Sequence, residues 1–199
     1  MKIIVVGGTG TVGKAVVKEL SSRHSIICVG NHSGDFQVDI GDKASISQMY
    51  QKIGSFDALV ATTGNVHFGA LSEFTAEQYQ IGLQSKLMGQ INLVLLGLPH
   101  INEKGSFTLT SGILNHDPIL YGSSAAMVNG AIDAFVLSAA IEMPKGIRIN
   151  SISPTVLTES MDKYAEYFRG YEPVPSTRVA LAYSKSVEGA QTGKVYRVW

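Results

Sequence analysis

A glycine-rich loop early in the chain has the residue types and spacing that hold a phosphate group. An apolar run, Ile3–Val6, leads into Gly7-Gly8-Thr9-Gly10-Thr11-Val12-Gly13, and a helix-patterned stretch follows from Lys14 to Ser21. Glycine lets the backbone approach a phosphate closely, and a helix N-terminus offers unpaired N–H groups and a positive dipole end. Because the loop follows a strand and opens a helix, it predicts a dinucleotide-binding unit. An ordinary strand-to-helix turn is the alternative.

The histidines and the single cysteine do not suggest a metal site. His67, His100 and His116 have no ligand spacing with one another or with Cys28. A lone cysteine in an apolar run is typical of a small buried side chain in a reduced compartment. We therefore expect no metal and no internal disulfide.

Composition restricts the classes of protein that this chain can be. Of its 199 residues 45% are hydrophobic and 16% are charged, and 16 basic residues balance 16 acidic ones. This predicts a single domain over residues 1–199 and, without a basic stripe, no nucleic-acid partner.

The longest apolar stretch is Ile91–Leu98, and it is interrupted by Asn92 and Gly97. Its length is far below the roughly 20 residues of a membrane span. With no signal-peptide pattern either, we expect a cytoplasmic protein.

Short β-rich runs alternate with helical patterns along the chain. This alternation predicts right-handed crossovers and a doubly wound α/β fold, in which helices cover both faces of a parallel sheet. The ligand of such a fold lies outside the carboxyl ends of the strands, so the loops after the strands should carry the function. The expected strands are Ile3–Val6, Ser25–Val29, Ala58–Ala61, Ser106–Thr110, Arg148–Ser153 and Val195–Val198. The expected helices are Val12–Ser21, Lys43–Ile53, Thr75–Leu98, Tyr121–Met143 and Arg178–Val187.

The chain resembles the short-chain dehydrogenase/reductases along nearly its whole length. That resemblance implies a Rossmann-type fold, an NAD(P) cofactor, and hydride transfer to or from a carbonyl or alcohol. Besides the glycine loop, its landmarks are Asp39-Ile40, similar to the acidic-apolar pair that contacts adenine; Thr62-Thr63-Gly64-Asn65, in place of an Asn-Asn-Ala-Gly turn; Thr110-Ser111-Gly112 after a strand; Tyr121 at a helix start; and the run 146–154, which ends in Pro154.

The resemblance also implies roles for individual residues. Ser111 would orient the substrate carbonyl, and Tyr121 would exchange a proton with its oxygen. The expected cofactor-binding residues combine those that the resemblance implies with Asn31, His32 and Ser33, the three candidates after the second strand. The full set is Gly7, Thr9, Gly10, Thr11, Val12, Gly13, Asn31, His32, Ser33, Asp39, Ile40, Thr62, Thr63, Gly64, Pro154, Thr155 and Thr158.

Two of the four catalytic positions of the family are altered. The tyrosine is normally followed four residues later by a lysine, and Ala125 stands there in this chain. The asparagine of the long helix is replaced by Lys86, three residues before Gly89. Without the lysine, a tyrosine with the ordinary pKa of about 10 is almost wholly protonated at pH 7. An active protein should therefore favour carbonyl reduction, which needs an acid, over alcohol oxidation, which needs a base.

Lys86 offers a substitute cation for the missing lysine. Its neighbours on the predicted helix are mostly small or apolar, so its ammonium needs a partner. We expect Lys86 to reach toward Tyr121 and the cofactor ribose and to replace the ammonium lost at Ala125. In the alternative, its stem packs on the helix while its head extends into water.

The residues after the second predicted strand favour NADP over NAD. Val29 is followed by Gly30-Asn31-His32-Ser33, and an acidic residue comes only at Asp35. An acid directly after the strand would accept the ribose hydroxyls of NAD. Asn31, His32 and Ser33 can instead donate hydrogen bonds to a 2′-phosphate. NAD stays open as the second choice.

Residues 158–177 stand where the family builds its variable substrate lid. The aromatic side chains of Tyr164, Tyr167, Phe168 and Tyr171 favour an apolar or aromatic substrate, whereas a short helix packed on the sheet edge is the alternative. In the family, the helices corresponding to residues 75–98 and 121–143 commonly form dimer faces. We therefore expect a homodimer or homotetramer.

The leading hypothesis is an NADP(H)-dependent oxidoreductase that acts on a small carbonyl or alcohol, with Ser111, Tyr121 and Lys86 at the site. The second is a catalytically weak or inactive dinucleotide-binding sensor or scaffold, because the glycine loop is intact while the lysine is lost. Both hypotheses predict cofactor binding, and they differ in hydride transfer.

Overall fold

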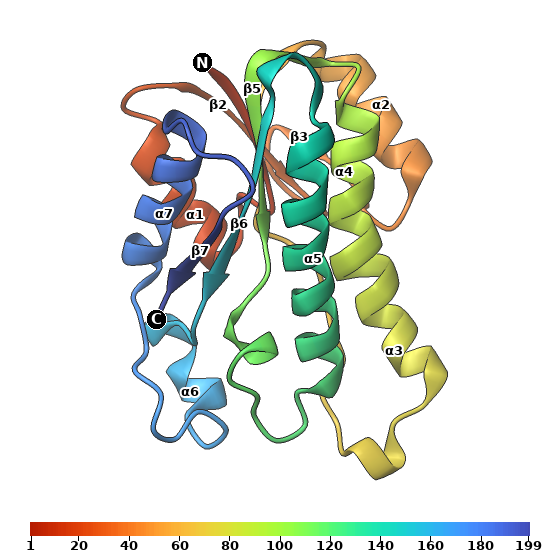
Figure 1. Cartoon of the computed structure of the whole chain (residues 1–199), viewed down its shortest axis with the longest axis vertical. Coiled ribbons are helices and arrows are strands. Elements are labelled where there is room, and N and C mark those ends of the chain that lie inside the picture. Colours follow the sequence, from red (N-terminus) through yellow and green to blue (C-terminus); the bar gives the residue numbers. More distant parts are fainter.

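A parallel sheet between two layers of helices makes up the structure, a computed structural model that describes residues 1–199 (Figure 1). Seven strands lie in the order β3-β2-β1-β4-β5-β6-β7, and every neighbouring pair is parallel. This confirms the predicted fold class. The strands are β1 Lys2–Val6, β2 Ser25–Gly30, β3 Phe36–Gln37, β4 Phe56–Ala61, β5 Ile101–Thr110, β6 Arg148–Pro154 and β7 Val195–Val198.

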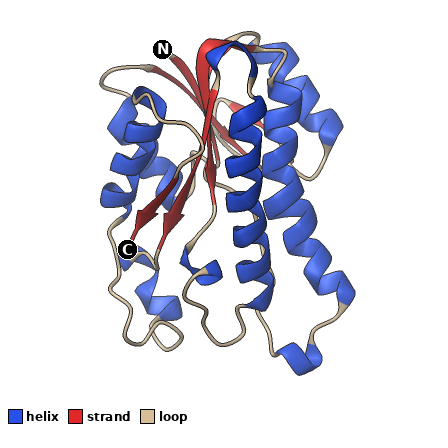
Figure 2. Ribbon diagram, in the orientation of Figure 1, coloured by secondary structure: helices blue, strands red, loops and turns tan.

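Helices cover both faces of the sheet, as the ribbon coloured by secondary structure shows (Figure 2). On one face lie α1 (Thr11–Leu20) and α7 (Ser176–Glu188), and on the other lie α2 (Lys43–Ile53), α4 (Gly89–Gly97) and α5 (Ser123–Glu142). Two shorter helices, α3 (Ala76–Gly82) and α6 (Met161–Tyr164), lie beyond the carboxyl ends of the strands. The chain order reverses at β1, whose neighbours are β2 and β4, and this is the position where folds of this class bind ligands.

Successive residues of the central strands enter two different cores. On β1, Ile4 and Val6 pack in the core beneath α2, α4 and α5, whereas Ile3 and Val5 pack in the core beneath α1 and α7. Side chains alternate between the two faces of a strand, so a strand covered on both faces needs an unbroken apolar run. That requirement explains why these strands were recognisable in the sequence.

Most predicted elements match the structure, and the differences have local causes. All six predicted strands are present, while β3 was missed because it has only two residues. The helix predicted over Thr75–Leu98 contains a π-helical segment, Leu83–Met88, between α3 and α4. The helix predicted from Tyr121 begins at Ser123 instead, because Tyr121 has a φ of 66°, which lies in the left-handed region and cannot continue into a right-handed helix.

α5 is long and apolar enough to cross a membrane by length and composition alone, with a mean hydropathy of 1.5 over its best window. In this fold it covers the sheet, and Val128, Ile132 and Val136 are fully buried. A core helix passes the same test as a membrane span. The expectation that Ile91–Leu98 is the longest apolar stretch is wrong, because α5 is longer and is apolar by composition.

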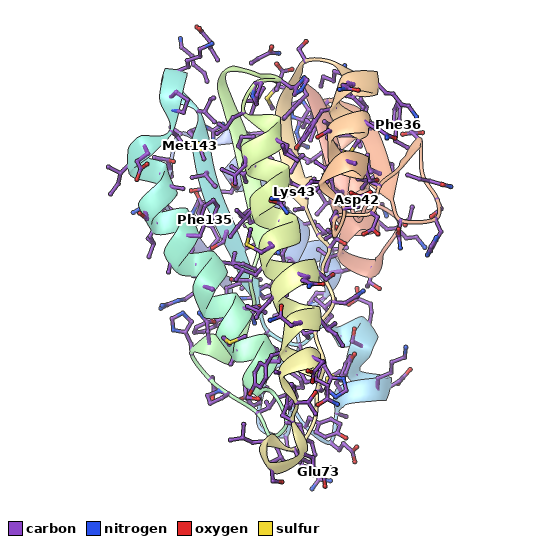
Figure 3. All side chains as sticks on the ribbon, turned by 90° about the vertical axis from the view of Figure 1, so that its right-hand side faces the viewer. Phe36, Asp42, Lys43, Glu73, Phe135 and Met143 are labelled. Carbon is purple, nitrogen blue, oxygen red and sulfur yellow. The ribbon has the colours of Figure 1, made fainter.

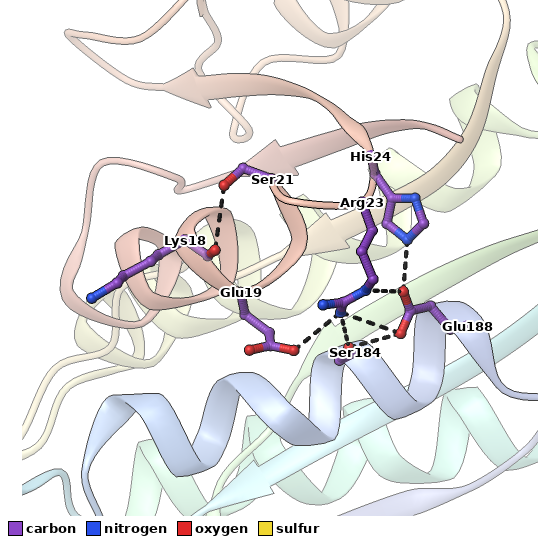
Figure 4. A network of polar contacts seen from close by, with 7 residues as sticks. All are labelled: Lys18, Glu19, Ser21, Arg23, His24, Ser184 and Glu188. Carbon is purple, nitrogen blue, oxygen red and sulfur yellow. Dashed lines mark hydrogen bonds and ion pairs between the residues drawn. The ribbon is translucent and has the colours of Figure 1, made fainter.

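An ion-pair network joins the end of α1 to the end of α7 (Figure 4). Arg23 Nε donates to Glu188 Oε1 at 2.8 Å, and Arg23 Nη2 donates to Ser184 Oγ at 2.8 Å and to Glu19 Oε1 at 3.1 Å. His24 Nε2 lies 2.7 Å from the same Glu188 oxygen. The hydrogen bond from Arg23, helped by those from His24 and Ser184, lowers the pKa of Glu188 to about 2.

Candidate functional site

The glycine loop forms a cradle that side chains would fill. Gly7 has a φ of 82°, and a Cβ there would lie 2.7 Å from the carbonyl oxygen of Thr62. A Cβ on Gly13 would lie 2.1 Å from the carbonyl oxygen of Gly7. No side chain caps the N-terminus of α1, where Gly10 is the N-cap residue, so the first N–H groups of the helix are free to bind an anion. The loop therefore fits a pyrophosphate.

A cavity of about 220 Å³ lies beside this loop, at the carboxyl ends of β1, β2 and β4. It brings together five of the predicted cofactor-binding residues, while His32 and Ser33 lie outside its lining. The ten lining residues are Val6, Gly7, Gly30, Asn31, Val38, Asp39, Ile40, Thr63, Asn65 and Ser85. The cavity is where a nucleotide held by the glycine loop would extend its adenosine half.

The acidic residue nearest the end of β2 is held by backbone groups. The Asp35 carboxylate accepts a hydrogen bond from the Cys28 N–H at 2.9 Å, and the Asp35 N–H donates to the Cys28 carbonyl at 2.7 Å. Asn31, His32 and Ser33 are exposed, and Asn31 Nδ2 lies 3.2 Å from His32 Nε2. The exposed side chains of Asn31, His32 and Ser33 are polar and can donate hydrogen bonds to a ligand at this strand end.

The loop after β4 rests on the π-helical segment. Gly64 has a φ of 120°, and a Cβ there would lie 2.6 Å from Lys86 Cα. The N–H of Asn65 donates to Ser85 Oγ at 3.0 Å. Only glycine allows this approach. The predicted cofactor loop and Lys86 are therefore held against each other by backbone packing.

Lys86 turns inward, toward the end of β5. Its Nζ donates a hydrogen bond to the carbonyl oxygen of Ser111 at 3.2 Å. Burial lowers the pKa of the Lys86 ammonium to about 8, and the negative charge of Asp133 opposes part of this shift. Gln90 holds the strand end nearby, because its side chain bonds both the N–H and the carbonyl oxygen of Thr110, at 2.8 and 2.9 Å.

Ser111 is buried, with 3% of its surface exposed, and its hydroxyl is engaged with the neighbouring strand. Ser111 Oγ donates to the carbonyl oxygen of Ile152 at 3.4 Å, at the long limit of a hydrogen bond. The next residue, Gly112, faces α5, and a Cβ there would lie 3.0 Å from Asn129 Nδ2. Asn129 Oδ1 is buried and has no hydrogen-bond partner.

Tyr121 lies outside α5, in the turn that precedes the helix. It is 40% exposed, its ring lies 6.2 Å from the ring of Tyr167, and its carbonyl oxygen accepts from the Gly69 N–H. No hydrogen bond joins it to Lys86 or Ser111. The structure thus brings two of the three predicted catalytic residues together, and the catalytic role of Tyr121 stays a prediction.

An apolar recess of about 230 Å³ opens beside Tyr121. Two of its walls, Tyr164 and Tyr167, come from the segment predicted as a lid, and the complete lining is Phe68, Ile119, Leu120, Tyr121, Tyr164 and Tyr167. Tyr171 ties that segment to the loop before α5, because its hydroxyl donates to the Asp117 carbonyl at 3.1 Å. The segment therefore covers the carboxyl edge of the sheet.

The last predicted cofactor residues follow β6. The Thr155 N–H donates to the carbonyl oxygen of Val198 at 3.0 Å, and the Thr158 N–H donates to the carbonyl oxygen of Val174 at 2.9 Å. These backbone hydrogen bonds hold both residues in place. Thr155 Oγ1 is buried and has no partner. Buried hydroxyls are rarely left unpaired. Thr155 directly follows the carboxyl end of β6, so its unpaired hydroxyl is available to a bound group.

Asp133 is a buried polar residue that was not among the predicted site residues. This residue of α5 is only 6% exposed, and its carboxylate accepts hydrogen bonds from Asn115 Nδ2 at 2.9 Å and Ser151 Oγ at 2.8 Å. The available signal was spacing, since Ala125, Asn129 and Asp133 follow one another at four-residue intervals and so share one face of a helix.

Parallel sheet, glycine cradle and cavity together define a dinucleotide-binding domain of the Rossmann type. The chain belongs to the short-chain dehydrogenase/reductase family. A family model described as Enoyl-(Acyl carrier protein) reductase matches residues 8–188.

Solved structures and curated proteins agree with this assignment. The crystal structure of the protein lin1944 from Listeria innocua is 54% identical with a TM-score of 0.99, and the match covers 100% of both chains. A small-chain dehydrogenase in complex with NADPH is 28% identical with a TM-score of 0.89, over 100% of this chain and 96% of that one. Versicolorin reductase 1 of Dothistroma septosporum is 26% identical over 204 residues, covering 86% of this chain and 74% of that protein. The resemblance seen in the sequence is thus confirmed.

Proposed function

We propose that this protein is an NADP(H)-dependent oxidoreductase that transfers a hydride between the nicotinamide and a small carbonyl or alcohol, and that it favours reduction. The observation that carries the proposal is the cavity that places Gly7, Asn31, Asp39 and Thr63 beside the uncapped start of α1. Similar proteins named as reductases and dehydrogenases support it.

The choice of NADP rests on the end of β2. The Asp35 carboxylate accepts a hydrogen bond from the Cys28 backbone, so it is turned to its own strand and is not placed to accept the ribose hydroxyls of NAD. Asn31, inside the cavity, and the exposed His32 and Ser33 beside it can donate hydrogen bonds to that phosphate. The relative solved in complex with NADPH supports the same choice.

The residues divide the work of binding among them. The glycine loop and the N-terminus of α1 would hold the pyrophosphate, Asp39 and Ile40 would meet the adenine, and Thr155 would offer its unpaired hydroxyl to the nicotinamide half. When bound, NADPH supplies the hydride. Ser111 and Lys86 would lie at the substrate carbonyl, with Tyr121 at the edge of the apolar recess.

The proposed substrate is an apolar or aromatic carbonyl compound. All six residues that line the recess are aliphatic or aromatic, and none carries a charge at neutral pH. An anionic group would lose its hydration there without gaining a partner. A hydrophobic substrate would instead gain by burial, most of all against the tyrosine rings.

The proposal includes a homodimer or homotetramer in the cytoplasm, built through α4 and α5. Leu95 on α4 and Leu137 and Ile141 on α5 are 53%, 54% and 87% exposed, so both helices present apolar side chains to solvent. Figure 3 faces this side of the molecule and labels Phe135 and Met143, which line a groove of about 270 Å³ between the helices.

The first test measures binding and turnover on one sample. Calorimetric titrations with NADPH and with NADH should show binding, with a higher affinity for NADPH than for NADH. The loss of NADPH absorbance is then followed with a panel of apolar aldehydes and ketones. Tight binding without turnover on any carbonyl would favour the sensor or scaffold function, and no binding would contradict both.

A further inference from the structure

We propose that Lys86 itself donates the proton to the substrate oxygen in this reduction, and that no tyrosine hydroxyl takes part. The inference rests on the proposed function and names the group that completes it. It goes beyond the expectation that Lys86 only assists Tyr121.

The position of Lys86 is fixed from two sides. On one side the backbone of Gly64 packs against its stem, since a Cβ on Gly64 would lie within 2.9 Å of Lys86 Cα, Cβ and Cγ. On the other side its Nζ donates to the Ser111 carbonyl at 3.2 Å. The residue lies in the π-helical segment Leu83–Met88, and such segments are frequent at functional sites. A fixed stem leaves the remaining N–H groups of the ammonium for a ligand at the end of β5.

Asp133 is the acidic residue of α5 whose negative charge acts on Lys86. The inner face of α5 carries Ala125, Asn129 and Asp133, which are 4%, 4% and 6% exposed, so only Asp133 brings a titratable side chain. Neither the end of β5, at Ser111 and Gly112, nor the loop 62–65 brings another. The segment after β5 brings His116, whose Nε2 lies 4.0 Å from Asp133 Oδ2. Asn115 and Ser151 hold the carboxylate by hydrogen bonds at 2.9 and 2.8 Å. Its negative charge raises the pKa of Lys86 against the effect of burial.

Tyr121 belongs to the substrate recess instead. It precedes α5 with a φ of 66°, and its ring faces Tyr167 among apolar side chains. At the position four residues later, Ala125 offers no group to lower its pKa. Lys86 is the side chain whose ammonium the structure places against the end of β5, where it donates to the Ser111 carbonyl.

The proton transfer balances without a further reactant. Once hydride has added to the carbonyl carbon, the former π electron pair belongs to the oxygen. One N–H bond of the Lys86 ammonium then breaks, its proton forms the O–H bond of the alcohol, and the nitrogen keeps the electron pair as a neutral amine. Water returns the proton to Nζ before the next turnover.

The test compares Lys86→Met, Asp133→Asn and Tyr121→Phe with the unchanged protein. For each we would measure the NADPH dissociation constant, the pH dependence of kcat, and the titration of the Lys86 ε-carbon by ¹³C NMR of lysine-labelled protein. Lys86→Met assigns that signal, because it removes it. The NMR titration and the binding constant do not depend on turnover.

We expect Lys86→Met to bind NADPH and to lose about 100-fold or more in kcat, the usual contribution of a general acid. Tyr121→Phe removes a hydroxyl from the wall of the recess, so it should act on KM and leave the pH dependence of kcat where it is in the unchanged protein. In the unchanged protein kcat should fall above pH 8, as Lys86 with its pKa of about 8 loses its proton. Asp133→Asn should move both the fall in kcat and the NMR titration to lower pH, which a merely structural role would not do.

Two results would overturn the inference and are distinguishable. If the unchanged protein reduces carbonyls and Lys86→Met does so equally well, the proton donor is another group while the proposed function stands. If the unchanged protein binds NADPH and reduces nothing on the panel, both the inference and the proposed function fail.

Discussion

The ammonium of Lys86 lies 3.2 Å from the carbonyl oxygen of Ser111, and this hydrogen bond joins the π-helical segment before α4 to the end of β5. These two elements meet where a Rossmann-type sheet binds its ligands. The contact therefore brings the Lys86 ammonium to the end of β5, at the proposed site, from a helix other than the one that normally supplies the lysine in the family.

Replacing Lys86 should stabilise the fold. Burial lowers the pKa of Lys86 from 10.5 to about 8, so the folded protein disfavours the charged form. The resulting penalty is fully present below pH 8 and disappears as the pH rises from 8 to 10.5. We expect Lys86→Met to raise the free energy of unfolding at pH 7 by about 1 to 2 kcal/mol. Urea denaturation at pH 7 and pH 10 checks this, since the gain should shrink at pH 10. An equal destabilisation at both values would contradict it.

Gly64→Ala should disturb both the fold and Lys86. Gly64 has a φ of 120°, and a Cβ would lie 2.6 Å from Lys86 Cα, a backbone atom that cannot move aside cheaply. We expect a loss of more than about 2 kcal/mol in the free energy of unfolding. Gly54→Ala is the matched control, because Gly54 also has a positive φ, 73°, but no atom within 4 Å of its Cβ position. Equal losses in the two variants would mean that strain alone, without the contact, sets the cost.

Asn31→Asp should change the cofactor preference. Asn31 lines the cavity beside the end of β2, where an added carboxylate would repel a 2′-phosphate. The NADPH affinity should fall by about 10-fold or more, while NADH binding is kept or improved. Calorimetric titration with both nucleotides checks this. Ser22→Asp adds the same charge on an exposed residue after α1 and should change neither affinity. Equal loss of both nucleotides would place Asn31 outside the 2′-phosphate site.

The ion-pair network of Glu188 should make stability depend on acidity. Chiefly through the hydrogen bond from Arg23, the folded protein lowers the pKa of Glu188 from 4.5 to about 2. The stabilisation is therefore complete above pH 4.5 and is lost as the pH falls toward 2. Because Glu188 is one-third exposed, we expect Glu188→Gln to cost at most about 1 kcal/mol at pH 7. Urea denaturation should show this cost disappear near pH 2, whereas Glu172→Gln, at an exposed glutamate without a partner, should cost nothing.

Leu137→Glu should separate the subunits of the proposed dimer. Leu137 is 54% exposed on the outer face of α5, and a charge buried in a subunit interface without a partner is costly. Sedimentation should show a smaller species than for the unchanged protein. Leu181→Glu, on α7 at the opposite face and 58% exposed, is the control and should keep the larger species. A monomer in all three samples would refute this part of the proposal.

Several features of this protein follow from short stretches of sequence. The runs Ile3–Val6 and Ala58–Ala61 are unbroken apolar residues, and both are buried strands because a sheet covered on two faces excludes water from every side chain. The glycines of the first loop predicted a phosphate cradle, since the need for a missing side chain is a property of the residue itself. These predictions depend on neighbours in the chain, and the sequence determined them.

Only the tertiary structure decided which side chains meet. Tyr121 was expected in a helix beside Lys86, yet its left-handed φ sets it in a turn against Tyr167. The spacing of Asp133 from Ala125 and Asn129 could place it on one helix face but not show its hydrogen-bond partners, because Asn115 comes from the 3-10 turn Ile113–Asn115 and Ser151 from β6. Contacts of this kind depend on how distant segments pack together, and the free energy of that packing is a sum over the whole core that no short pattern contains.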